Sequence, residues 1–349
     1  MAFDARREDY QRLGLRFARS LDGMDAEQAA RAFATFGMRF AREHDTLPQT
    51  DSDRAFHLVA HAAQLIDYEL PFVELDRANE IIEEGHRTLD EALALDSHCY
   101  DALRMLEASR GPSFEDFLST LIQRVDEVRD WCDLQRSEVT GDPSDERTRL
   151  ALDLAQRPYL RWLATMCDQA LICGHNLQAL EFGRRALEVD PRDQAGVSLT
   201  MLYAYAKLEQ ADELEEFLRE RREQGYGIGE RNAWLLIARM ALAYKRYDMS
   251  AAREHLSTLI ASYANADYAL VRQIELYAGV FSRQVVIPQS EDEVILALSE
   301  AMPLLEEGAD PRGKGSFSNW VLFETTRQHP EAMLLAMAEQ RQYGQEDQT

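Results

Sequence analysis

The clearest structural signal in the chain is RPYLRWLATMCDQALICGHNLQALEFGRRALEVDP, residues 157–191. Apolar residues recur in it at spacings of three and four on both sides of Gly174, which is the period of an amphipathic helix. Gly174 interrupts that period and marks a turn between two helices. Pro191 ends the second helix, because proline has no amide hydrogen with which to continue the helical hydrogen bonds. The stretch therefore predicts one helix-turn-helix unit.

This unit fits the tetratricopeptide (TPR) pattern, a repeat of about 34 residues that folds as two helices. Ala179 and Ala186 fall on the two positions where small side chains let the helices approach each other. Leu163 takes the position that tryptophan usually holds. Ala170 and Gly183 stand where aromatic residues are usual. We therefore expect a degenerate copy with a weakened contact between its two helices.

The pattern recurs twice further along the chain. A second copy begins at Ala195, and a third begins near Arg231 with Trp234 at the tryptophan position. A single helix pair cannot bury its own apolar face, and about three stacked pairs are needed for stability. We therefore predict an all-α protein, namely an α-solenoid of stacked antiparallel helix pairs with degenerate TPR-like repeats and helical caps.

Helix start and stop signals divide the chain into four predicted parts. These are an N-terminal helical cap or small bundle (1–70), a helical and partly repeat-like segment (71–157), the TPR-like repeat core (158–282) and a C-terminal helical cap with a polar tail (283–349). Asp25, Ser113 and Ser290 are expected to cap helices, because each precedes an apolar run and has a suitable partner three residues on. Asp51 or Ser52 is expected to cap another. Pro158 is expected in the first turn of a new helix, after another that ends at Gln156.

The composition limits the classes of partner. The chain has 349 residues and a net charge of −24, and 46% of its residues are apolar. Its 17 Gly and 10 Pro are too few for a turn-rich β protein. The negative charge argues against non-specific nucleic-acid binding and against an anionic membrane surface, because both depend on Lys and Arg. Alternatively, the acidity serves only to keep the protein soluble.

The N-terminus and the cysteines predict a cytoplasmic protein. Residues 1–15 have mixed charges and lack the apolar run of a signal peptide, and no run of about 18 apolar residues occurs in the sequence. The four cysteines lie in amphipathic stretches without a Cys-x-x-Cys spacing, so we expect buried thiols in a reducing compartment. No cofactor is predicted.

Two sequence segments resemble a known family. The segments RPYLR, residues 157–161, and LEVDPRDQAGV, residues 187–197, are similar to bacterial TPR proteins related to the suppressor of tumorigenicity seven family. Gln194 and Ala195 stand where the family pattern has Asn and Gln. The resemblance covers about residues 89–320. It implies an all-α repeat fold and a non-enzymatic binding role, and it names no substrate.

The repeat pattern also predicts a binding face. In stacks of this type, the first helix of each pair lines a concave surface. The polar side chains at the positions that usually face it are Arg161, Asp168, Tyr203, Lys207, Asn232 and Arg239. Their basic members suit a protein or peptide partner with an acidic group or a free carboxylate, through charge-assisted hydrogen bonds. The alternative is a solvated face that binds nothing.

Two histidines support an alternative of a different class. His57 and His61 lie one turn apart on one expected helix, a spacing that can hold a metal ion. A third ligand would come from a neighbouring segment, with His44, Asp45 and Glu69 as candidates. The pair supports a metal-binding sensor or a metal-dependent enzyme. The other interpretation is two ordinary histidines without a metal.

The sequence favours the first class, a non-catalytic scaffold that binds a protein or peptide partner on the inner surface of residues 158–265. No nucleophile, base or phosphate-binding loop is assembled by local spacing anywhere in the sequence. A third hypothesis is self-association through residues 1–70, which would make the protein a homo-oligomer.

Overall fold

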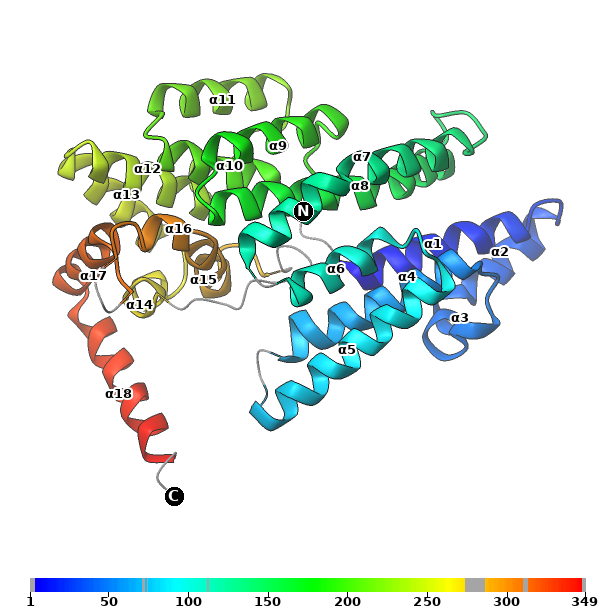
Figure 1. The fold of residues 1–349 in the computed structure, drawn as a ribbon, viewed down its shortest axis with the longest axis horizontal. Coiled ribbons are helices and arrows are strands. Elements are labelled where there is room, and N and C mark those ends of the chain that lie inside the picture. Colours follow the sequence, from blue (N-terminus) through cyan, green and yellow to red (C-terminus); the bar gives the residue numbers. More distant parts are fainter. Residues whose placement is uncertain are drawn as a thin grey trace. The chain divides into compact units, whose positions relative to one another are not determined.

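The structure, a computed structural model, describes residues 4–70, 73, 75–111, 113–273, 286–309 and 313–346. Every regular element in these ranges is a helix, and no strand occurs among them (Figure 1). The predicted all-α fold class is therefore confirmed. None of the described helices is long and apolar enough to cross a membrane.

The chain forms two compact units, and it passes from one to the other within a single helix, α8. Described residues up to Thr165 form the N-terminal unit, and those from Met166 onward form the C-terminal unit. The helices that begin in the N-terminal unit are α1 (Ala5–Ser20), α2 (Ala26–Ala34), α3 (Phe36–Arg42), the 3-10 turn η1 (His44–Thr46), α4 (Asp51–Ala63), the π-helical turn η2 (Gln64–Glu69), α5 (Leu75–Leu95), α6 (Tyr100–Arg110), α7 (Phe114–Ser137) and α8 (Glu146–Ile172).

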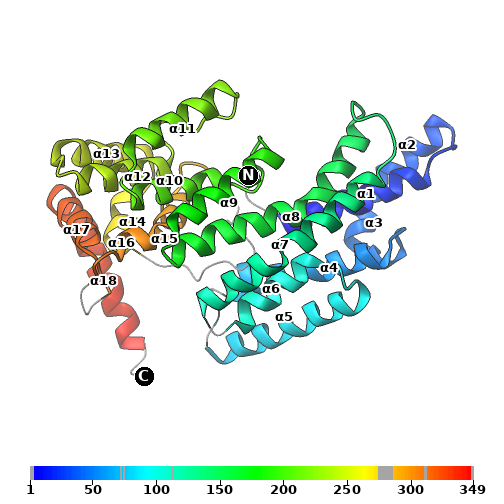
Figure 2. The same cartoon turned by 45° about the horizontal axis from the view of Figure 1, so that its top comes forward.

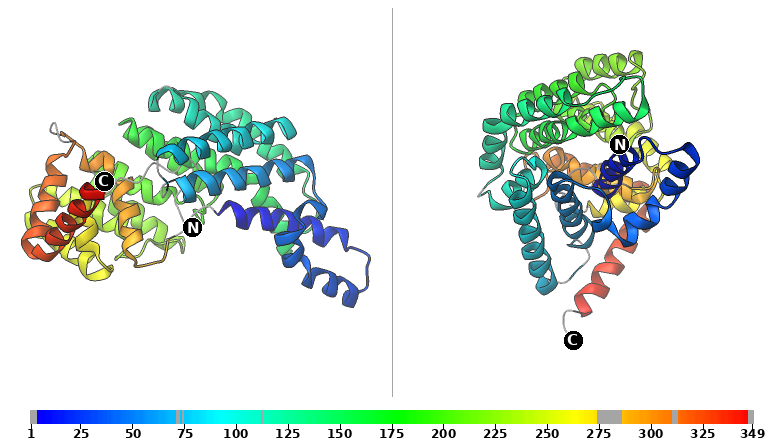
Figure 3. Two further views of the ribbon diagram at one scale, coloured as in Figure 1. Left: turned by 90° about the horizontal axis from the view of Figure 1, so that it is seen from below. Right: turned by 90° about the vertical axis from the view of Figure 1, so that its right-hand side faces the viewer.

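The C-terminal unit continues from the last part of α8. Its further helices are α9 (Asn176–Val189), α10 (Val197–Lys207), α11 (Ala211–Glu223), α12 (Ala233–Lys245), α13 (Met249–Ser262), α14 (Ala266–Arg272), α15 (Glu291–Glu300), α16 (Met302–Leu305), α17 (Ser316–Gln328) and α18 (Pro330–Glu346). Within this unit α14 contacts α15, α17 and α18 (Figure 3).

The predicted caps at Asp25, Ser113 and Ser290 are confirmed, whereas the one predicted at Asp51 or Ser52 is wrong, because Thr50 precedes them in that role. The Asp25 carboxylate accepts hydrogen bonds from the first backbone amides of α2 at 3.0 Å. The hydroxyls of Ser113 and Ser290 each accept from the backbone amide three residues on, at 3.1 and 3.3 Å. At α4 the cap is Thr50, whose hydroxyl accepts from the amide of Asp53 at 3.3 Å. These contacts satisfy amides that have no partner within their own helix.

Helix α8 differs from the prediction. It is continuous from Glu146 to Ile172 and contains Pro158 in its interior, whereas the sequence predicted one helix that ends at Gln156 and another that begins near the proline. An interior proline removes one helical hydrogen bond and costs about 3 kcal/mol. Tertiary burial offsets this cost, because the Trp162 ring is fully buried and its Nε1 donates to the carbonyl oxygen of Leu121 at 2.9 Å.

The core of the N-terminal unit lies between α4, α5 and α6, which pack side by side (Figure 2). Its buried side chains include Phe56, Val59, Leu89 and Met105. A second cluster is formed by α1, α3 and the residue that follows η1. Its buried side chains are Leu13, Phe17, Phe36 and Leu47. Because α4 and α5 pack against each other, the predicted boundary after residue 70 falls between helices that share one core.

The core of the C-terminal unit is built on α10 and α12. These two helices contact each other, and α9 and α13 pack against α10 and α12 respectively. Nearly all of α12 is buried, from Ala233 to Ala243, as expected for a helix that is apolar on every side. Trp234, at the predicted tryptophan position, is 3% exposed, and its N-terminal counterpart Leu163 is fully buried.

Gly183 on α9 allows a close approach by α10. A Cβ atom at this position would lie 2.5 Å from the sulfur of Met201 and 3.5 Å from that of Cys167. The sequence predicted a weakened contact here, because an aromatic residue is usual at this repeat position. The methionine of the next helix instead fills the space that the missing side chain leaves.

Candidate functional site

The predicted binding residues of α10 contact a later segment of the chain. Tyr203 is fully buried, and its hydroxyl donates to the carbonyl oxygen of Ala297 on α15 at 2.8 Å. Lys207 donates from Nζ to the carbonyl oxygen of Pro303 on α16 at 3.0 Å. Helices α15 and α16 therefore cover the surface on which these two side chains lie.

Carboxylates of the same segment contact α10 and α12. The indole Nε1 of Trp234 donates to Glu300 at 2.6 Å. The Nζ atoms of Lys245 and Lys207 lie 2.7 and 3.4 Å from one carboxylate oxygen of Glu307. Trp234 and Lys245 were not among the predicted site residues. We call the surface formed by Tyr203, Lys207, Trp234 and Lys245 the lysine face.

The segment on the lysine face, residues 290–307, is amphipathic. Its apolar side chains are buried, with Val294, Ala297 and Leu298 on α15 and Leu304 on α16 at most 1% exposed. Its acidic side chains reach the two lysines and the indole at the edge of this apolar contact. The lysine face therefore combines apolar burial with charge-assisted hydrogen bonds to carboxylates.

Asp168 and Asn232, two more of the predicted residues, have local structural partners. Asp168 accepts a hydrogen bond from the hydroxyl of Thr200 at 2.6 Å. Asn232 is the N-cap of α12, and its side-chain oxygen accepts from the amide of Leu235 at 3.2 Å. Asp168 thus stabilises the contact between α8 and α10, and Asn232 stabilises the first turn of α12.

Arg239 on α12 lies between two acidic side chains. Its guanidinium donates to both carboxylate oxygens of Glu215 at 2.8 Å and to Glu230 at 2.6 Å. Burial by itself would lower the pKa of Arg239, but the hydrogen bonds to these two carboxylates outweigh that effect, so the pKa lies above its usual value. The guanidinium remains charged and already has two anionic partners.

Two of the six predicted residues are buried. Tyr203 is covered by α15, and Arg161 is 5% exposed and belongs to the N-terminal unit. Neither side chain is open to solvent at the concave position that the repeat pattern predicted for it. The repeat positions were assigned from local spacing, which carries no information about a segment that returns from residues 290–307. The binding of a partner stays a prediction.

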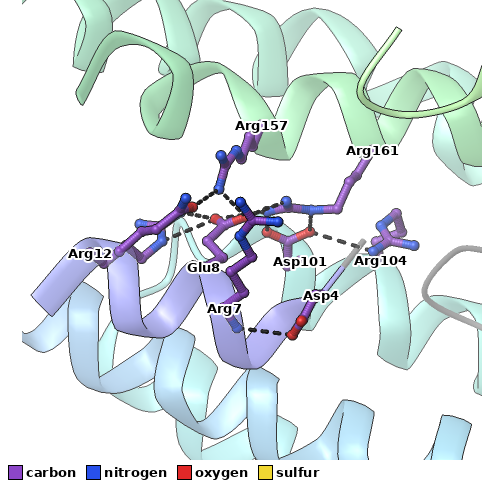
Figure 4. A network of polar contacts seen from close by, with 9 residues as sticks. Asp4, Arg7, Glu8, Arg12, Asp101, Arg104, Arg157 and Arg161 are labelled. Carbon is purple, nitrogen blue, oxygen red and sulfur yellow. Dashed lines mark hydrogen bonds and ion pairs between the residues drawn. The ribbon is translucent and has the colours of Figure 1, made fainter. Parts of the chain in front are cut away.

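Arg161 lies in a buried network of charged side chains (Figure 4). Its Nε donates to Asp101 on α6 at 2.6 Å, and its Nη1 donates to Glu8 on α1 at 2.8 Å. Arg157 and Arg12 also donate to Glu8, at 3.2 and 2.9 Å. No local signal could have revealed this network, because Glu8 precedes Arg161 by 153 residues.

The network keeps both carboxylates ionised. Burial raises the pKa of Asp101, but the charge and hydrogen bonds of Arg161 and the charge of Arg104 lower it to about 2. Burial likewise opposes ionisation of Glu8, and Arg161, Arg12 and Arg157 outweigh it, so the pKa of Glu8 falls below its usual value. A buried carboxylate is stable in its charged form only when such partners are present.

Next to Glu8 on α1, Asp9 contacts two histidines. Its Oδ2 lies 2.6 Å from Nδ1 of His57 on α4 and 3.4 Å from Nε2 of His44 on η1. The two imidazole rings stack with their centroids 3.6 Å apart. His61, the predicted second ligand, contacts Glu84 at 4.0 Å and takes no part in this cluster.

The prediction from the histidine pair therefore needs correction. A one-turn spacing places His57 and His61 on one helix, but only His57 is directed at Asp9. His44 was one of the three candidates for a third ligand, and it is the one that lies beside His57. Asp9 was not predicted, since it is 48 residues from His57.

The cysteines are thiols. Cys99, Cys132 and Cys167 are buried as predicted, Cys173 is partly exposed, and no disulfide joins them in the part of the chain that the structure describes. Burial raises the pKa of both Cys99 and Cys132 to about 12, so these two thiols are protonated at neutral pH. They are therefore poor nucleophiles.

No family model matches the chain, and no curated protein or solved structure matches it either. The resemblance to TPR proteins thus stays a prediction from the sequence.

Proposed function

We propose that the protein is a non-catalytic scaffold of degenerate TPR-like repeats, arranged as an α-solenoid, that binds an acidic amphipathic helix of a protein or peptide partner on its lysine face. The proposal narrows the predicted concave surface to α10 and α12. The chain's own segment 290–307 is the template for the partner, and it occupies the face in the absence of one.

The observation that carries the proposal is the pairing of Glu300 and Glu307 with the lysine face. The chain has only three lysines among its 38 basic Lys and Arg residues, and two of them, Lys207 and Lys245, contact Glu307. Their side chains are 16% and 14% exposed, so water screens these ion pairs less than it screens pairs on the open surface. The combination supports specific recognition of carboxylates.

The chemistry of the face defines the partner. An apolar strip must replace Val294, Ala297 and Leu298, and one acidic side chain must reach the indole of Trp234. A second acidic side chain, seven residues further on and beyond the end of α16, must reach the two lysines. A helical segment with an apolar stripe and two acidic residues seven positions apart, the second beyond a break in the helix, meets these requirements.

A labelled synthetic peptide with the sequence of residues 288–309 tests the proposal on the full-length protein. The tethered segment competes at an effective concentration in the millimolar range, so we expect weak binding to the wild type. The double variant Glu300→Gln, Glu307→Gln weakens the tethered competitor. We expect it to bind the peptide at least about tenfold more tightly, as measured by fluorescence anisotropy.

A second peptide, with Gln at both acidic positions, is the matched control. It preserves the apolar stripe, so loss of its binding assigns the affinity to the two carboxylates. If neither protein binds the acidic peptide, or if both peptides bind equally well, the segment is a permanent part of the core and the proposed function is wrong.

A further inference from the structure

Asp9 is a buried carboxylate without an arginine. It is 2% exposed, its Oδ2 contacts His44 and His57, and its Oδ1 has no hydrogen-bond partner among the described residues. The preceding residue, Glu8, has the guanidinium groups of three arginines within hydrogen-bond distance. Burying an anion costs free energy unless a cation or several hydrogen-bond donors compensate its charge. We therefore expect a positively charged partner at Asp9.

The two histidines present nitrogen atoms to this carboxylate. The candidate ligand atoms of Asp9, His44 and His57 all lie within 4.8 Å of one another. Neither ring nitrogen of His44 has a hydrogen-bond partner among the described residues, although its side chain is only 13% exposed. Unsatisfied imidazole nitrogens at a buried carboxylate are the donors that a transition metal requires.

We propose that Asp9, His44 and His57 bind a divalent transition-metal ion of the Zn²⁺ class, in a site that is separate from the lysine face. Two imidazoles and one carboxylate leave a fourth, open position in a tetrahedral site. Ca²⁺ and Mg²⁺ fit less well, because they prefer six or more oxygen ligands and this cluster supplies one carboxylate.

The distances require only a small adjustment. Ligand atoms about 2.0–2.1 Å from Zn²⁺ in a tetrahedron lie about 3.3 Å apart. The 3.4 Å between His44 Nε2 and Asp9 Oδ2 meets this value, whereas the 2.6 Å between His57 Nδ1 and Asp9 Oδ2 must widen. The ion replaces the shared proton of that hydrogen bond, which is released to solvent. The rings are stacked, so one of them must also turn for both nitrogen lone pairs to meet at the ion; the His57 side chain is 42% exposed and has room to do so.

A second carboxylate, on an exposed side chain, lies near the far nitrogen of His44 and can reach it by a small movement, although it makes no hydrogen bond there. Nδ1 of His44 lies 3.7 Å from Asp45, while Nε2 of the same ring faces Asp9. A carboxylate on the far nitrogen is the usual outer partner of a metal-bound histidine, because it fixes the ring and makes the ligand more basic. The ligands come from α1, η1 and α4, so one ion would join three elements of the N-terminal unit.

Another group of side chains is a weaker candidate and serves as an internal comparison. Asp267, His329 and Glu331 also place ligand atoms within 4.8 Å of one another. That group has a single histidine, and the side chain of Glu331 is 64% exposed. We therefore assign the ion to Asp9, His44 and His57.

Metal titration of the full-length protein, purified without a histidine tag and stripped with a chelator, tests the site. We expect one equivalent of Co²⁺ to give the visible absorption of a tetrahedral or five-coordinate complex, and Zn²⁺ to displace it. Zn²⁺ should raise the melting temperature, because it binds the folded state. His44→Gln, His57→Gln and Asp9→Asn should each weaken binding at least about 100-fold.

His61→Gln is the matched control, since it removes the other histidine of the predicted pair from the same helix and should leave affinity unchanged. His329→Gln tests the comparison group in the same way. Circular dichroism of the metal-free variants shows which of them fold. If Asp9→Asn does not fold, His57→Gln still tests the site, because the His57 side chain is partly exposed and its replacement should leave the fold intact. No Co²⁺ absorption in the wild type, unchanged affinity in His57→Gln, or loss of binding in His61→Gln or His329→Gln would overturn the proposal.

Discussion

Arg161 compensates the charge of two buried carboxylates at once, Glu8 and Asp101. Replacement by Met leaves an apolar stem of similar length, but both anions lose their central partner. We expect Arg161→Met to lower the free energy of unfolding by about 3–5 kcal/mol, because an unpaired buried charge is strongly destabilising. Urea unfolding followed by circular dichroism measures this loss.

Arg239→Met is the control for that experiment. Arg239 also has two acidic partners, but both of these side chains are more than half exposed. Ion pairs with exposed partners contribute at most about 1 kcal/mol, so the control should lose much less stability. Equal losses in the two variants would show that burial of the network has no special role.

Asp101 makes the stability of the protein depend on pH. Its pKa is about 2 in the folded state and 3.8 without the fold. The unfolded chain therefore binds the proton first, so Asp101 stabilises the fold above about pH 4 and the contribution disappears as the pH falls towards 2. The contribution is about 2 kcal/mol. Urea unfolding of wild type and Asp101→Asn should show a stability difference that narrows over this interval; a constant difference would contradict the assignment.

Among the helices, the contact between α9 and α10 depends on Gly183. An added methyl group would collide with Met201, whose sulfur lies 2.5 Å from the position of a Cβ atom. We expect Gly183→Ala to destabilise the protein by about 1–3 kcal/mol, although alanine is the better helix former. Thermal unfolding measures the effect. Gly229→Ala, where nothing lies within 4 Å, is the control, and an equally large loss there would refute the steric explanation.

A substitution in helix α8 is expected to make the protein more stable. Pro158 lies in the interior of α8 and supplies no amide hydrogen. Pro158→Ala restores one helical hydrogen bond, and we expect it to stabilise the protein by about 1–3 kcal/mol. The midpoint of urea unfolding reports the change. A lower midpoint would show that the proline ring contributes packing that alanine cannot replace.

The helices themselves were predictable because their signals are local. Apolar spacing and the caps at Asp25, Ser113 and Ser290 depend on residues within one or two turns, and these predictions are confirmed. The continuity of α8 through Pro158 was missed, because the burial of Trp162 that supports it depends on α7. Tertiary contacts override local propensity at such positions.

For the whole molecule, the net charge of −24 predicts a response to salt. Mutual repulsion of the excess carboxylates destabilises the compact state, and salt screens it. The buried network around Arg161 is screened much less. We therefore expect the urea midpoint to rise between low salt and about 0.3 M NaCl, where the Debye length is shorter than about 8 Å. A falling midpoint would mean that exposed ion pairs outweigh the repulsion.

The candidate sites were less predictable than the fold, because they bring together residues that are distant in sequence. The repeat pattern identified Lys207, but not the carboxylate of Glu307, which returns to it from the C-terminal part of the chain. The histidine spacing identified His57, whereas Asp9 and His44 reach it through the packing of α1 and η1 against α4. A sequence pattern can place a ligand on a helix face but does not specify what faces it.

The distance in sequence between Glu8 and Arg161 has a consequence for biosynthesis. The two residues are 153 positions apart, and a ribosome adds about 5–20 residues each second, so α1 leaves the exit tunnel about 8–30 s before its arginine partner. Throughout that interval the Glu8 carboxylate stays hydrated, because the Arg161 guanidinium that pairs with it in the folded protein has not yet been made. The N-terminal unit therefore completes its folding late, when translation has passed α8, and nascent chains that stall earlier would be targets for chaperones.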